Sequence, residues 1–134
     1  MASHQEIDQR SRMLHQLIAE KIRQDSSLFG NVKRTLARWR KIVSADSQPY
    51  LEEWQRLVDL GIEGCLAVAT EDSERANALR QASPFCGVLT NEERWEFLLE
   101  WDKDHGASEQ EIKERRQKMI EDQDMLEKNN YFEK

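Results

Sequence analysis

The sequence predicts an all-α protein. Apolar residues recur every three or four positions over most of the 134-residue chain, which is the spacing of one helix face. Three segments carry the Ser/Thr-x-x-Glu pattern that caps helix N-termini. No stretch shows the alternation of a strand, and no Asn-Gly or Asp-Gly turn joins strand-like runs. We therefore expect a compact bundle of about six short helices with a long charged helix at the C-terminus.

The first two expected helices lie before residue 44. Ser3 and Glu6 have the capping-box form, and apolar residues continue at helical spacing to Ile22, which predicts a helix from about residue 4 to 24. The polar residues 25–27 end it. A second helix follows Gly30, and one side of it carries a buried stripe of Val32, Leu36, Trp39 and Val43.

The middle of the chain predicts two further helical stretches with a break between them. Pro49 suits the first turn of a helix that Gly61 should end. Apolar positions then continue at helical spacing from residue 62 to 79, and we interpret the polar residues 70–73 as a break rather than a turn of one longer helix.

The loop over residues 83–90, SPFCGVLT, is unusually apolar, and the rest of the chain should be organised around it. Gly87 can adopt a positive φ that other residues adopt only with strain. Because connecting loops are usually polar, Phe85, Val88 and Leu89 indicate that this loop folds back onto a core. The four tryptophans lie at helical spacing with leucines, and we expect all four in that core: Trp39, Trp54, Trp95 and Trp101.

Two more capping boxes start the C-terminal helices. Thr90 begins a helix that should end near Gly106 in the left-handed conformation, and Ser108 begins a helix that should end at Asn129. We divide the chain into a helical domain over residues 1–105 and an acidic C-terminal helix and tail over residues 106–134.

Charge is distributed unevenly along the chain. Residues 1–89 carry 12 acidic and 12 basic residues and are neutral, whereas residues 90–134 carry 14 acidic and 8 basic residues and hold the whole net charge of −6. The acidity therefore belongs to the C-terminal third.

The composition also favours a cytoplasmic protein. No apolar run approaches the roughly 20 residues that cross a bilayer, and the N-terminus lacks the basic and apolar regions of a secretory signal. Cys65 and Cys86 sit in apolar settings without CxxC spacing, so we interpret both as reduced core thiols.

The residues that could carry chemistry form no recognisable motif. His4, His15 and His105 match no metal-binding spacing, and we expect them on the surface. Phosphate-binding glycine motifs are missing. Four glutamates between residues 92 and 100 share helical spacing, but a solvated acidic face explains them better than a metal site. We expect no enzyme activity, no cofactor and no metal.

Two surfaces remain as candidates for binding. The second helix carries five cations opposite its apolar stripe, which could contact nucleic acid or an acidic protein, or be balanced by acids of neighbouring helices: Lys33, Arg34, Arg38, Arg40 and Lys41. The last helix has only a narrow apolar ridge, which could contact a partner, pair with a second copy, or close the chain's own bundle. Its candidate partner-binding residues are Ile112, Met119, Ile120, Met125, Leu126, Tyr131 and Phe132.

Part of the chain resembles a family. The strings YLEEW at 50–54, LRQASPF at 79–85 and GVLTNEERW at 87–95 resemble small, uncharacterised bacterial helical proteins associated with toxin–antitoxin gene pairs. The resemblance covers roughly residues 10–100 and supplies no catalytic residues. It implies a cytosolic binding protein that holds a partner inactive, such as a cognate toxin.

We therefore expect an antitoxin-like protein–protein interaction module that inhibits its partner. Acidic helices can cover the basic surface of such a partner, because charge complementarity speeds the encounter. The alternatives are a nucleic-acid-binding regulator that uses residues 33–41, and a self-assembling helical adaptor.

Overall fold

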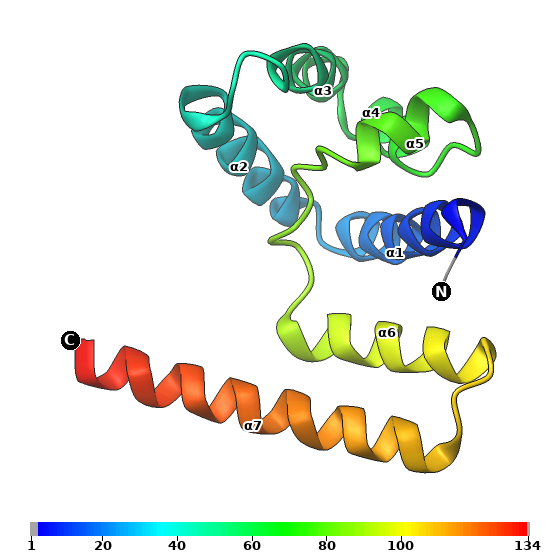
Figure 1. Ribbon diagram of the computed structural model, residues 1–134. Helices are drawn as coiled ribbons and strands as arrows, with labels where there is room; N and C mark the ends of the chain where they lie inside the picture. The colour runs from blue at the N-terminus through cyan, green and yellow to red at the C-terminus, as the bar shows by residue number, and fades with distance from the viewer. Residues whose placement is uncertain (1–2, 134) are drawn as a thin grey trace. The chain divides into compact units, whose positions relative to one another are not determined.

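The computed structural model describes the backbone of residues 3–133 and the side chains of residues 3–126 (Figure 1). Every regular element in this range is helical, so the all-α prediction is confirmed. The elements are α1 (His4–Gln24), a 3₁₀ turn (Ser26–Leu28), α2 (Phe29–Ile42), α3 (Gln48–Leu60), α4 (Ile62–Ala69), α5 (Glu74–Arg80), α6 (Asn91–Asp104) and α7 (Glu109–Glu133). Over the described residues, no helix is long and apolar enough to cross a membrane.

The helix-start signals form as the sequence predicts. At α6 the capping box is complete: Thr90 Oγ1 accepts a hydrogen bond from the amide of Glu93 (3.1 Å), and the Glu93 carboxylate accepts one from the amide of Thr90 (2.9 Å). Ser3 and Ser108 cap α1 and α7 by accepting hydrogen bonds from the amide three residues later, each at 3.1 Å. These caps are local, so the sequence suffices to place them.

Glycines end two of the helices. Gly61, with φ of +116°, ends α3, and Gly106, with φ of +100°, follows α6; both were predicted. Gly87, which as a glycine could adopt a positive φ, is not among the positive-φ residues of the described chain. The predicted break over residues 70–73 is confirmed, since α4 ends at Ala69 and α5 begins at Glu74.

Two other helix boundaries differ from the sequence prediction. α2 starts at Phe29, before Gly30, because it continues directly from the 3₁₀ turn. α7 continues past Asn129 to Glu133. Asparagine is a weak helix former rather than a terminator such as proline, which explains why this pair does not end the helix.

The chain divides into an N-terminal unit, Met1–Leu89, and a C-terminal unit, Thr90–Lys134. The sequence places a boundary at residues 105 and 106 instead, whereas this division groups α6 with α7. Within the N-terminal unit α1 packs against α4 and α5, and α2 packs against α3 (Figure 1). Within the C-terminal unit α6 and α7 form a helical hairpin.

Trp54 lies at the centre of the N-terminal core. Its side chain is fully buried, and its ring meets Phe85 edge-to-face with the centroids 5.4 Å apart. The indole Nε1 donates a hydrogen bond of 2.9 Å to the carbonyl of Leu79 at the end of α5. Phe85 and Val88 are buried in the same cluster, so the prediction that the apolar loop folds onto a core is confirmed.

Some side chains expected in the core are not fully buried. Trp54 and Trp101 are buried, but Trp39 and Trp95 are only half-buried. Cys65 is buried, and this burial raises the pKa of its thiol to about 12. Cys86 is exposed, contrary to the prediction, because Phe85 and Val88 on either side of it fill the core instead.

Replacing Trp54 with phenylalanine tests the role of this residue. The change leaves a cavity and removes the donor to the Leu79 carbonyl, so we expect the free energy of unfolding to fall by about 3 kcal/mol. Urea denaturation followed by circular dichroism measures it. The matched variant Trp39→Phe, at a half-buried site, should cost clearly less, and equal losses would contradict the account.

Candidate functional site

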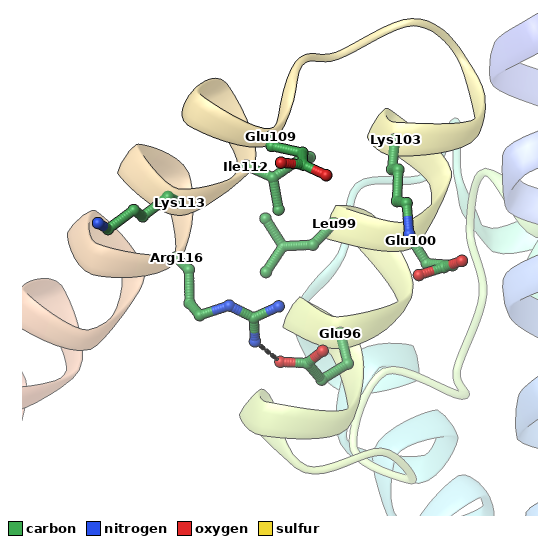
Figure 2. Close-up of a pocket in the computed structure, with 8 residues that line it drawn as sticks. All are labelled: Glu96, Leu99, Glu100, Lys103, Glu109, Ile112, Lys113 and Arg116. Atoms are coloured by element: carbon green, nitrogen blue, oxygen red, sulfur yellow. Dashed lines mark hydrogen bonds and ion pairs between the residues drawn. The ribbon is translucent and has the colours of Figure 1, made fainter.

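The α6–α7 hairpin carries a hollow with an apolar floor. Leu99 of α6 and Ile112 of α7 point toward one another there (Figure 2). The hollow has a volume of about 300 Å³, and its remaining lining is charged: Glu96, Glu100, Lys103, Glu109, Lys113 and Arg116. It can receive one apolar side chain, with carboxylates and cations at its rim.

Polar contacts hold the two helices of the hairpin together. Arg115 of α7 forms an ion pair of 2.8 Å with Asp102 of α6, and Arg116 forms another with Glu96 (Figure 2). These side chains are partly exposed, and exposed ion pairs contribute roughly 0–1 kcal/mol each. Among the described residues of the hairpin only Leu99 and Trp101 are buried apolar side chains, far fewer than in the N-terminal unit.

A second hollow, of about 330 Å³, lies further along α7. Trp95 of α6 and Ile120 of α7 supply its apolar surface. Its other lining residues are Glu92, Glu96, Arg116, Gln123 and Asp124, three of which are acidic. An apolar side chain with a neighbouring cation would match it.

The residues predicted to bind a partner differ in their exposure to solvent along α7. Ile112 and Met119 are half-buried. The residues that follow are more open, with exposed fractions of 43% for Ile120, 63% for Met125 and 57% for Leu126. The side chains of Tyr131 and Phe132, also predicted to bind, lie outside the described residues. Apolar exposure thus increases beyond residue 119.

The basic face of α2 is fully formed. All five predicted cations are exposed, and among the described residues none of them has a carboxylate within ion-pair distance. Lys33 lies over the Phe29 ring, with Nζ 5.6 Å from the centroid, and Arg34 donates a hydrogen bond to Asn31. The five cations are Lys33, Arg34, Arg38, Arg40 and Lys41.

A buried histidine, which the sequence analysis placed on the surface, fastens the central loop to α1. His15 Nδ1 lies 2.7 Å from the carbonyl oxygen of Ser11, and Nε2 lies 2.7 Å from Ser83 Oγ. Because a carbonyl oxygen can only accept, Nδ1 must donate, and the neutral ring must accept the Ser83 hydroxyl proton at Nε2. Burial lowers the pKa of His15 to about 4, which keeps the ring neutral at pH 7.

The contacts of the Ser83–His15 pair are structural, because both residues hold Phe85 in place. The Ser83 hydroxyl also accepts a hydrogen bond from the amide of Phe85 (3.3 Å), and the His15 ring meets Phe85 edge-to-face at 5.8 Å. The pair thus positions the residue that packs on Trp54. His15 lies three and seven positions before Ile18 and Ile22, so the helical pattern contained a signal for its burial.

A buried arginine was also missed by the sequence analysis. Arg80, with 4% of its surface exposed, donates hydrogen bonds from Nη1 to the carbonyls of Ala69 (3.0 Å) and Glu71 (2.8 Å). Arg12 donates from Nε to the carbonyl between them, that of Thr70 (2.9 Å). Burial lowers the pKa of Arg80. Two guanidinium groups thus satisfy the free carbonyls where α4 ends, as cations at helix C-termini do.

No metal centre is assembled within the described part of the chain, since no three His, Cys, Asp or Glu side chains gather closely enough to hold an ion. Comparisons with protein-family models, with curated proteins and with solved structures give no match. The candidate binding surfaces of the described chain are the hairpin of the C-terminal unit and the basic face of α2.

The buried His15 predicts a pH-dependent stability. Its pKa is lower in the folded protein, about 4 against 6.5, so the unfolded chain binds the extra proton between these values. Stability should be complete above pH 6.5 and fall by up to about 3 kcal/mol as the pH decreases to 4. Urea denaturation at half-unit intervals of pH measures it.

Two variants isolate the contribution of His15. His15→Gln should flatten the pH profile between 6.5 and 4.5, whereas His4→Gln, at an exposed site, should keep the parent slope. Glu71, whose carboxylate bonds to Arg75 and has its pKa lowered to about 2, titrates at lower pH. An unchanged slope in His15→Gln would refute the assignment.

Proposed function

We propose that this chain is a cytoplasmic, antitoxin-like interaction module that binds a basic protein partner through its C-terminal unit and holds it inactive, with no catalysis of its own. The observation that carries the proposal is the exposure of Ile120, Met125 and Leu126 on the most acidic part of the chain. In this proposal the N-terminal helices form a compact bundle, and α7 is the charged rod that contacts the partner.

The apolar exposure supports an interface on α7. A helix gains most of its stability by packing an apolar face, yet more than half of the Met125 and Leu126 side chains is open to solvent. Methionine adapts to irregular partner surfaces, and large apolar side chains in an otherwise polar helix are typical anchors for a groove. The hollow beside Trp95 and Ile120 would receive a side chain in return.

The charge supports a basic partner. Residues 90–134 carry 14 acids and 8 bases, and Glu92, Glu96 and Asp124 line the hollow that contains Ile120. Complementary charge accelerates association and selects partners. A toxin that acts on RNA or nucleotides has a basic surface of the kind that would fit, which agrees with the resemblance of residues 79–95 to proteins of toxin–antitoxin gene pairs.

The test uses the products of the genes adjacent to this one. Each is co-expressed with the full chain, and complexes are separated by size-exclusion chromatography and measured by titration calorimetry. One adjacent product should bind and lose its toxicity. The double variant Met125→Ser/Leu126→Ser should weaken binding by roughly 100-fold, because removing two interface anchors costs about 3 kcal/mol.

The matched control is Ile42→Ser/Leu60→Ser, which alters two exposed apolar residues of the N-terminal unit (71% and 67% exposed). This control should bind like the parent. The proposal is wrong if no adjacent product binds or if the α7 variant binds as tightly as the parent. A parent that dimerises by itself, and a variant that does not, would assign α7 to self-assembly instead.

A further inference from the structure

The cations of α2 occupy one continuous face of the helix. At about 100° per residue, Arg40 and Lys33 lie on one flank, and Lys41, Arg34 and Arg38 lie on the other. Between the flanks lie Gly30 and Ala37, the smallest residues of the helix. The opposite side packs into the core through Phe29, Val32 and Leu36.

Five of the other arginines of the N-terminal unit have an ion-pair or carbonyl partner, and Arg10 is the exception; none of the α2 cations has an acidic partner among the described residues. Arg23, Arg56 and Arg75 are paired with Glu63, Glu53 and Glu71. Arg12 and Arg80 bond to carbonyls instead. The α2 cations have neither kind of contact, since no acidic residue occurs between Asp25 and Asp46 in the sequence. An external polyanion would therefore meet no carboxylate on this helix.

The composition of the face favours nucleic acid over an acidic protein. Protein interfaces have an apolar or aromatic centre within a polar rim. Here the centre holds only Gly30 and Ala37, and the side chains on both flanks are cations. Arginine and lysine on both sides of a flat centre match the two phosphate backbones that border a groove.

We propose that α2 binds double-stranded DNA, lying along the major groove with its cations on the two phosphate backbones. The major groove of B-form DNA, about 12 Å wide, admits an α-helix, whereas the major groove of duplex RNA is deep and narrow. Gly30 and Ala37 would face the groove, where their small size permits close approach.

Fluorescence anisotropy with a labelled DNA duplex of mixed sequence tests the proposal, using the full chain at several NaCl concentrations between 50 and 200 mM. Five phosphate contacts should give a slope of log K against log salt of about −4.5. The variant Arg38→Gln/Arg40→Gln should reduce the magnitude of this slope by about 2 and weaken binding roughly 10- to 100-fold. Circular dichroism confirms that the variants, altered only at exposed sites, remain folded.

The variant Arg56→Gln/Arg75→Gln is the matched control, since it removes the same charge from paired arginines elsewhere in the N-terminal unit. It should keep the affinity and the slope of the parent. Equal weakening by both variants, or no DNA binding at 50 mM NaCl, overturns the proposal. An RNA duplex of the same sequence that binds as tightly as DNA overturns the groove assignment, and polyglutamate that binds as tightly assigns the face to an acidic protein.

Discussion

The contact between Trp54 and Phe85 joins parts of the N-terminal unit that are far apart in the sequence. Trp54 belongs to α3 and reaches the end of α5 through its hydrogen bond to the Leu79 carbonyl. Phe85 belongs to the loop that follows α5 and also contacts His15 of α1. Three helices and the loop therefore meet at one aromatic pair, and the His15 ring beside it is hydrogen-bonded to Ser83. This arrangement explains how a chain with 34% charged residues still builds an apolar core.

The C-terminal unit is built on a different balance of forces. Its two helices are fastened by Leu99, Ile112 and exposed ion pairs, while Met125 and Leu126 remain open. Apolar surface that a chain does not bury itself is available to a partner. In the N-terminal unit the candidate binding surface is electrostatic instead, because the α2 cations have no carboxylate within ion-pair distance among the described residues. The two proposed binding surfaces thus differ in chemistry and lie in different units.

The sequence predicted what depends on neighbouring residues. The caps at Thr90 and Ser108, the helix end at Gly61 and the break after Ala69 each follow from a few adjacent side chains, and all four are confirmed. The apolar loop was also recognised, because its composition is unusual for a connection. The basic face and the ridge of α7 were found for the same reason, since helical spacing places their residues on one side.

What the sequence did not predict depends on contacts between distant residues. His15 and Ser83 are 68 positions apart, and no local pattern pairs them. No sequence pattern indicates the burial of Arg80, whose guanidinium donates hydrogen bonds to the carbonyls at the end of α4. Cys86 was predicted in the core but is exposed, because Phe85 and Val88 point inward instead. Trp39 was also predicted in the core, but it is only half-buried and packs against the edge of it. The burial of these residues depends on packing between distant segments, which the spacing of apolar residues along the chain does not reveal.

The central claim is that the N-terminal unit is stabilised by its own core, whereas residues 117–126 of α7 are stabilised mainly by binding a partner. Amide hydrogen exchange of the full chain, followed by mass spectrometry, tests this most directly. The account predicts that α3 and residues 83–88 exchange only on global unfolding, while residues 117–126 open at a free energy at least about 2 kcal/mol lower. Equal protection of residues 117–126 and α3 would contradict it.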